Sequence, residues 1–190
     1  MNDVAYSKIN DHEDYEIING QVYMMSRPAT AHMQIEGNIL MAFRNYLKGK
    51  SCRPFNETDV FFDDDNNFIP DVIIVCDPEI IEDDGIYGTP DLVVEILSPS
   101  TARNDKIKKK IAYEKYGVKE YWIVDPFSKS VEVYLRKDDK LELDDVYSTY
   151  RDFEWKKLTE EEKAAVKKAI KLSLYDDFYV TLEDIFENVK

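Results

Sequence analysis

Glu95 is the residue whose position first suggests chemistry, because it stands inside an apolar run. The segment Pro90–Thr101 reads PDLVVEILSPST, and hydrophobic side chains flank Glu95 on both sides. A carboxylate in such a run loses its hydration unless a partner compensates the charge. Glu95 is therefore predicted either to be paired or to have a functional role.

Asp71 is the best candidate to share a site with Glu95. Asp91 lies on the same strand face as Glu95, but the two are about 13 Å apart along a strand, and an ion with metal–oxygen bonds of about 2.0–2.6 Å cannot span that distance. Asp71 begins the preceding apolar run, DVIIVCD, and neighbouring strands bring facing side chains to about 5 Å. Two carboxylates at this distance repel each other, and the repulsion raises the pKa of one of them. A divalent cation between them would remove the repulsion. Ligation by oxygen alone favours magnesium or manganese over zinc.

The helix expected after Glu95 supplies a possible cation. Asp105, Lys109 and Tyr113 stand four residues apart, which places them on one stripe of a helix. Two structural alternatives stay open at this point. Glu95 could be a structural carboxylate paired with Lys109 or a tyrosine hydroxyl, and Lys109 could be one more solvated lysine in a charged run.

The elements that must position these residues form an α+β pattern. The runs 68–77 and 90–97 are apolar on both faces, which predicts central strands covered on both sides. Further strands are expected at 15–18, 21–25, 52–62, 120–126 and 130–136, and helices at 30–48, 101–117, 159–171 and 180–189. The order predicts a single domain, residues 1–190, with a mixed sheet flanked by helices.

Composition narrows the function classes. The chain of 190 residues has 25 basic and 39 acidic residues, and its net charge of −14 argues against a broad surface that binds polyanions. A local basic groove, or a site where a metal supplies positive charge, stays possible. Cys52 and Cys76 match no metal-ligand spacing, so reduced cysteines in a cytosolic protein are the default expectation. With no signal-peptide pattern and no apolar run of about 20 residues, a cytoplasmic location is expected and no membrane association.

Four segments of the chain resemble the Uma-type putative restriction endonuclease family, which belongs to the PD-(D/E)XK nuclease superfamily. The segments are RPATAHMQIEGNIL, IPDVIIV, PDLVVEILSPST and NDKIKKKIAYEKYGVKEYWIVDP. The resemblance covers about residues 14–186 and is most specific between Pro90 and Pro126. It implies a restriction-endonuclease-like fold.

The resemblance also implies roles for individual residues. In the superfamily, an Asp and a second acidic residue on neighbouring strands hold magnesium, and a Lys helps to activate water. Asp71 and Glu95 match the two acidic residues. The usual Lys would be residue 97, which is Leu97 here, and the family has instead a Lys in the next helix, where Lys109 lies.

Four further residues are expected to support this site. Glu36 could match a helical acidic residue of the superfamily and complete the metal shell through a water, and His32 matches a family histidine just ahead of it. Asp105 and Tyr113 stand four residues on either side of Lys109. The structural alternatives are an exposed helix glutamate for Glu36 and a hydrogen-bonding residue at the helix start for His32.

The resulting prediction is a Mg2+-dependent endonuclease that hydrolyses phosphodiester bonds of nucleic acid, with DNA as the expected substrate and Mn2+ as an alternative ion. The second hypothesis is a non-cleaving nuclease-fold module that binds nucleic acid or protein, which the charge of −14 favours. A homodimer is plausible, since cutting two strands needs two sites.

Overall fold

A mixed sheet forms the centre of the structure, a computed structural model that describes residues 15–99 and 102–190. Its strands are β3 (Arg53–Asn56), β6 (Val72–Val75), β8 (Leu92–Ile96), β9 (Glu120–Asp125), β10 (Ser130–Lys137) and β11 (Lys140–Ser148). Their order is β11-β10-β9-β8-β6-β3. β8 and β9 run parallel, whereas the other neighbours are antiparallel. The predicted α+β class with a mixed sheet is confirmed.

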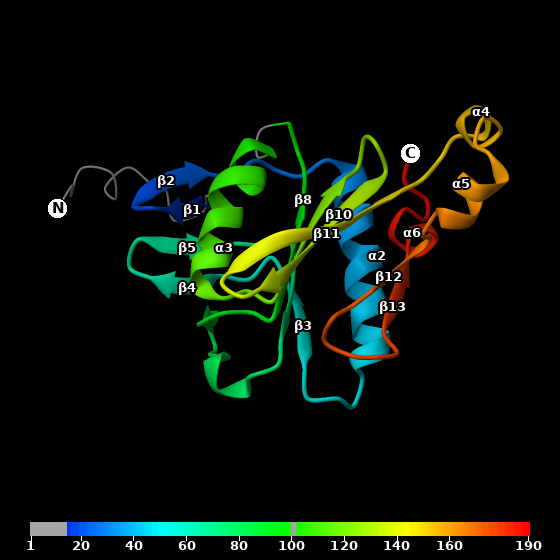
Figure 1. The fold of residues 1–190 in the computed structure, drawn as a ribbon. Helices are drawn as coiled ribbons and strands as arrows, with labels where there is room; N and C mark the ends of the chain where they lie inside the picture. The colour runs from blue at the N-terminus through cyan, green and yellow to red at the C-terminus, as the bar shows by residue number, and fades with distance from the viewer. Residues whose placement is uncertain (1–14, 100–101) are drawn as a thin grey trace.

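Alternation along β6 and β8 gives the sheet two apolar faces. On one face, α2 (Thr30–Leu47) packs Ile35, Ile39 and Phe43 into a core that also holds Val94. On the other face, Val93 packs in a second core with Tyr113 of α3 (Lys110–Tyr116). Figure 1 shows α2 and α3 on opposite sides of the sheet. Glu95 shares its strand face with Val93, so it points toward α3.

A second sheet lies on the α3 side of the molecule (Figure 1). Its strands are β1 (Tyr15–Ile18), β2 (Gln21–Met24), β4 (Val60–Asp63), β5 (Asn66–Phe68) and β7 (Ile86–Tyr87), in the order β2-β1-β5-β4-β7. The expected β1–β2 hairpin is present, with Asn19 and Gly20 both at positive φ. The hairpin therefore brings β1 beside the elements that carry the candidate site.

Two expected strands are each divided between the sheets. The run 52–62 breaks at Glu57, whose φ of +43° lies in the left-handed region, so β3 and β4 join different sheets. The run 68–77 breaks at Pro70, since proline has no N–H to donate to a ladder. Asp71 therefore lies at the point where the chain crosses from the second sheet into β6.

The helix after β8 contains an irregular first part. A π-helical turn, η2 (Asn104–Lys109), leads directly into α3. Gly117 ends the helix at φ +92°, as the expected C-cap. The expected first residue of this helix, Thr101, lies outside the described residues.

The C-terminal part departs most from expectation. Thr159 and Glu162 form the predicted capping box, but the helix α5 (Glu160–Ala165) ends well before residue 171. Residues Ala169–Lys171 are instead strand β12, which pairs with β13 (Tyr179–Thr181). The remaining elements are α4 (Asp152–Trp155), α6 (Leu182–Ile185) and a 3-10 turn, η1 (Pro78–Ile80). In the described part of the chain, every helix is too short or too polar to cross a lipid bilayer.

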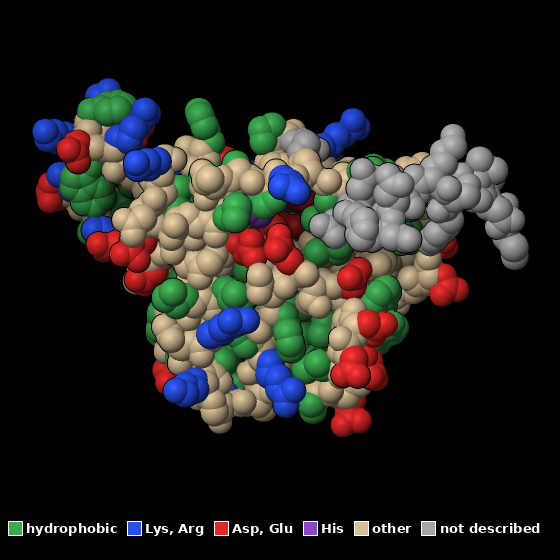
Figure 2. All heavy atoms as spheres, turned by 180° about the vertical axis from the view of Figure 1, so that it is seen from behind, with side chains coloured by type: hydrophobic (Ala, Val, Ile, Leu, Met, Phe, Trp, Pro, Cys, Tyr) green, Lys and Arg blue, Asp and Glu red, His purple; other side chains and the backbone are tan. Residues whose placement is uncertain are grey.

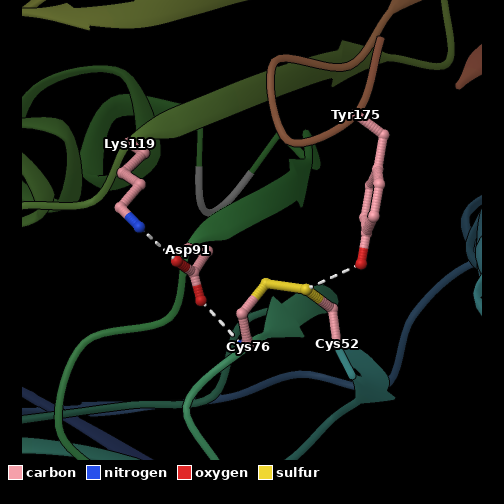
Figure 3. The surroundings of a disulfide bond; sticks show 5 residues. All are labelled: Cys52, Cys76, Asp91, Lys119 and Tyr175. Atoms are coloured by element: carbon pink, nitrogen blue, oxygen red, sulfur yellow. Dashed lines mark hydrogen bonds and ion pairs between the residues drawn. A yellow bond between two sulfur atoms is a disulfide. The ribbon is translucent and has the colours of Figure 1, made fainter. Parts of the chain in front are cut away.

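The expectation of reduced cysteines is wrong, because Cys52 and Cys76 form a disulfide. Arg53 pairs with Val75 in the antiparallel ladder of β3 and β6, so the two cysteines are the next facing pair, with Cα atoms 3.9 Å apart. Figure 3 shows Asp91 beside this bond, where it accepts from the Cys76 N–H and pairs with Lys119. Asp91 is thus a strand-start residue, and the cytoplasmic expectation loses the support of its cysteine argument.

Reduction of this disulfide is expected to destabilise the fold. The two residues are 24 positions apart, and closing a loop of that size stabilises a protein by about 3 kcal/mol through the unfolded state. Thermal unfolding with and without a reductant measures the effect. A Cys52→Ser/Cys76→Ser variant should not respond to reductant, and an unchanged melting temperature of the reduced wild type would contradict the prediction.

Candidate active site

Lys109 is the centre of a buried group of charges. Its Nζ lies 2.6 Å from Glu16 Oε1, 3.0 Å from Glu95 Oε1 and 3.5 Å from Asp105 Oδ1. Lys109 is 3% exposed, and all three carboxylates are buried as well. We call Glu16, Glu95, Asp105 and Lys109 the Lys109 cluster. The π-helical turn contributes two of its members, in keeping with the frequent occurrence of such turns at functional sites.

Tyrosine hydroxyls complete the hydrogen bonding of the cluster. Tyr113 donates to Glu95 Oε1 at 2.6 Å, and Tyr121 donates to the Asp105 backbone carbonyl at 3.0 Å. The predicted stripe of Asp105, Lys109 and Tyr113 is therefore present and faces Glu95. Glu95 also makes the two contacts expected of a purely structural carboxylate, one with a lysine and one with a tyrosine hydroxyl.

The cluster carries more negative than positive charge. Burial raises the pKa of Glu95 well above its usual value, and the charges of Asp105, Asp71 and Glu16 add to this, while Lys109 opposes it. Burial by itself would lower the pKa of Lys109, but the carboxylates around it raise the pKa well above its usual value. Lys109 thus stays an ammonium, and one further positive charge, from a proton or a cation, would relieve the repulsion among the carboxylates.

Asp71 lies beside Glu95 at one end of the central sheet. Val72 pairs with Val94 in the antiparallel ladder, so Asp71 and Glu95 are the next facing positions. Asp71 Oδ2 accepts from the backbone N–H of Ile96, the residue after Glu95. The predicted neighbourhood of the two carboxylates therefore follows from the strand register.

His32 and Glu36 approach Asp71 from α2. His32 Nε2 lies 3.2 Å from Asp71 Oδ1. Burial lowers the pKa of His32, but the hydrogen bond and charge of Asp71 outweigh it, and the net shift is upward. Glu36 Oε1 accepts from Asn56 at 2.8 Å, and burial raises the pKa of Glu36, with Glu57 and Asp71 adding to the rise. On the face shown in Figure 2, acidic side chains gather beside a histidine near the middle of the molecule.

The donor set of Asp71 and Glu95 suits a hard cation in number and chemistry. Within residues 15–99 and 102–190, no group of three or more His, Cys, Asp and Glu side chains could hold a metal ion. Mg2+, however, is commonly bound through one or two carboxylates, with waters and substrate phosphates as its other ligands. Three of the four carboxylate oxygens of Asp71 and Glu95 already contact protein groups, so ion binding would replace some of these contacts.

Glu16 is the site residue that the sequence interpretation missed. Its Oε1 makes the shortest contact to Lys109 and also accepts from the Ile69 N–H at 2.9 Å. A signal was present, since Glu16 interrupts the apolar strand run YEII as Glu95 interrupts LVVEIL. The other predicted site residues come together in two adjoining groups, one around Lys109 and one around Asp71.

Comparison with known proteins identifies the family. A family model named Uma2, described as "Putative restriction endonuclease", matches residues 3–162. The uncharacterized protein slr1290 of Synechocystis is 31% identical over 131 residues, which make up 67% of this chain and 68% of that protein. The crystal structure of a "putative nuclease belonging to DUF820" from Anabaena variabilis superposes with a TM-score of 0.71 at 21% identity, over 95% of this chain and 94% of that one, which shows a shared fold. The resemblance noted in the sequence is confirmed, and the chain belongs to the Uma2 family.

Proposed function

We propose that the chain is a Mg2+-dependent nuclease that hydrolyses phosphodiester bonds of DNA. The observation that carries the proposal is the position of Asp71 beside Glu95, with the Lys109 ammonium 3.0 Å from Glu95. Two acidic groups with a cation beside them match the requirements of metal-assisted hydrolysis. Membership of a family described as "Putative restriction endonuclease" supports the same function.

Each residue has a distinct proposed role. Asp71 and Glu95 would hold Mg2+ or Mn2+, with Glu36 reaching it through water. A bound ion of this kind lowers the pKa of a water ligand and polarises the phosphate. Lys109 is already protonated, so it cannot take a proton from water; it would hold Glu95 in place and offset negative charge on the phosphate. His32 would orient Asp71 through its Nε2 contact.

A cleavage assay tests the proposal. Purified protein is incubated with plasmid or single-stranded DNA in the presence of Mg2+, Mn2+ or EDTA. We expect cleavage with either ion and none with EDTA. Asp71→Asn should lower the rate at least about 100-fold, in the range seen when one electrostatic contact to a transition state is removed.

Asp77→Asn is the matched control, because Asp77 follows the other end of β6 and is exposed. It should cleave as the wild type does. Cleavage that survives both Asp71→Asn and Lys109→Ala would show that another site, or a contaminant, performs the reaction.

The burial of the site residues favours a second candidate function, that of a non-cleaving nuclease-fold module. Glu95 and Lys109 are almost fully buried, and the chain has a net charge of −14. A module of this kind would keep the Lys109 cluster for structure and bind nucleic acid or protein elsewhere. Binding of DNA without cleavage under every ion condition would favour this function over the nuclease.

We further propose that the active form is a homodimer, since cleavage of both strands of a duplex requires two sites. Sedimentation of the protein with and without duplex DNA tests the dimer. A monomer under both conditions would contradict it.

A further inference from the structure

We propose that a cavity beside the Asp71–Glu95 pair is a nucleobase-binding pocket in which Phe127 stacks on the base. The proposal rests on the proposed function, because it assigns one part of the same substrate. The cavity has a volume of about 340 Å³. It lies between the start of α2, the end of β8 and the turn that joins β9 to β10.

The cavity adjoins the candidate active site through His32 and Leu97. His32 lines the cavity and contacts Asp71 at 3.2 Å. Leu97 lines it as well and follows Glu95 closely along the chain. A nucleotide with its phosphate at Asp71 and Glu95 would therefore have its base within reach of the cavity.

The lining of the cavity suits a base and not a phosphate. None of the described residues that line it is Lys or Arg, and one of them, Asp125, is acidic. A phosphate would meet the negative charge of Asp125 there and find no lysine or arginine among these residues. A base would bury its flat apolar surface against Leu97, Pro99 and Pro126, and its N–H groups could donate to a carboxylate.

Phe127 is presented to the cavity by a turn that is held at both ends. Asp125 Oδ1 accepts from the backbone N–H groups of Phe127 at 2.8 Å and Ser128 at 3.4 Å. Lys129 donates through Nζ to the Val189 carbonyl at 2.8 Å. The Phe127 side chain is 100% exposed. A fully exposed aromatic ring, carried by a hydrogen-bonded turn at the edge of an apolar cavity, offers a stacking surface for a base.

Binding of short oligonucleotides tests the pocket. The dissociation constant is measured by fluorescence anisotropy, with Ca2+ in place of Mg2+ and with single abasic positions placed along the strand. For the wild type, an abasic position in the pocket should raise the dissociation constant about tenfold, within the range for loss of one base–aromatic stack. Phe127→Ala should raise it by about the same factor, and the abasic position should then have no further effect.

Phe127→Tyr keeps an aromatic ring and should bind as the wild type does. Phe153→Ala is the matched control, because Phe153 is also exposed but lies on α4 and does not line the cavity. The pocket is overturned if Phe127→Ala binds as the wild type does, or if the abasic penalty persists in that variant.

The two proposals fail in different ways. Cleavage with Mg2+ by a protein whose binding does not depend on Phe127 overturns the pocket and leaves the nuclease intact. A Phe127-dependent abasic penalty in a protein that never cleaves supports the pocket and overturns the nuclease.

Discussion

Replacing Lys109 by Met is expected to lower the free energy of unfolding by about 3–5 kcal/mol, the usual cost of removing one partner from a buried ion pair. Three buried carboxylates, those of Glu16, Glu95 and Asp105, lie within 3.5 Å of the Lys109 ammonium. Without it they would face one another with no compensating charge. Urea denaturation followed by circular dichroism measures the change.

The matched control is Lys106→Met, in the same π-helical turn. The Lys106 side chain is 41% exposed and pairs with Glu132 at the surface, where such pairs contribute about 0–1 kcal/mol. Equal losses in the two variants would contradict the charged cluster. Adding Glu16→Gln to Lys109→Met should recover part of the lost stability, since it removes one of the three carboxylate charges that Lys109 no longer compensates.

Glu95→Gln is expected to stabilise the metal-free protein at neutral and higher pH while abolishing cleavage. The pKa of Glu95 is raised in the folded state, mainly by burial. The folded protein therefore holds a proton that the unfolded chain releases, and stability falls as pH rises from the unfolded pKa through the raised folded value. Gln cannot lose that proton, so the variant escapes the fall.

Melting temperatures across pH measure this effect. At about pH 4 the variant and wild type should melt together, and at about pH 8 a gain of 1 kcal/mol would raise the melting temperature of the variant by about 2–4 °C. Mg2+ should stabilise the wild type and not the variant. Glu120→Gln is the control for the ion, because Glu120 is a buried carboxylate that accepts from Ser173 and Trp122, outside the Lys109 cluster, and Mg2+ should still stabilise this variant. A lower melting temperature of Glu95→Gln at about pH 8 would mean that Glu95 is chiefly a structural ion-pair partner.

The sequence predicted the core of the site because two regular periods govern it. The alternation of side chains along a strand fixes the face of Glu95, and the register of neighbouring strands brings Asp71 opposite to it. The helical repeat places Asp105, Lys109 and Tyr113 on one stripe, even though the π-helical turn alters the spacing locally.

The sequence did not predict the features of the site and the fold that depend on tertiary contacts. Glu16 meets Lys109 only because the β1–β2 hairpin folds against α3, and no local pattern encodes that approach. Glu57 adopts a left-handed φ without being glycine, so the division of the run 52–62 had no sequence signal. β11 is mostly exposed and polar, and β10 is the one described strand that pairs with it.

One carboxylate oxygen of Glu16 links two parts of the candidate site. That one atom accepts from Ile69, two residues before Asp71, and contacts Lys109. The motif residues Asp71, Glu95 and Lys109 all follow the start of α2, at Thr30. A protein trimmed to that point would retain every motif residue, yet it would lose the strand that ties the two halves of the site together. We therefore expect the candidate site to need the β1–β2 hairpin, and any shortened or chimeric version should keep it.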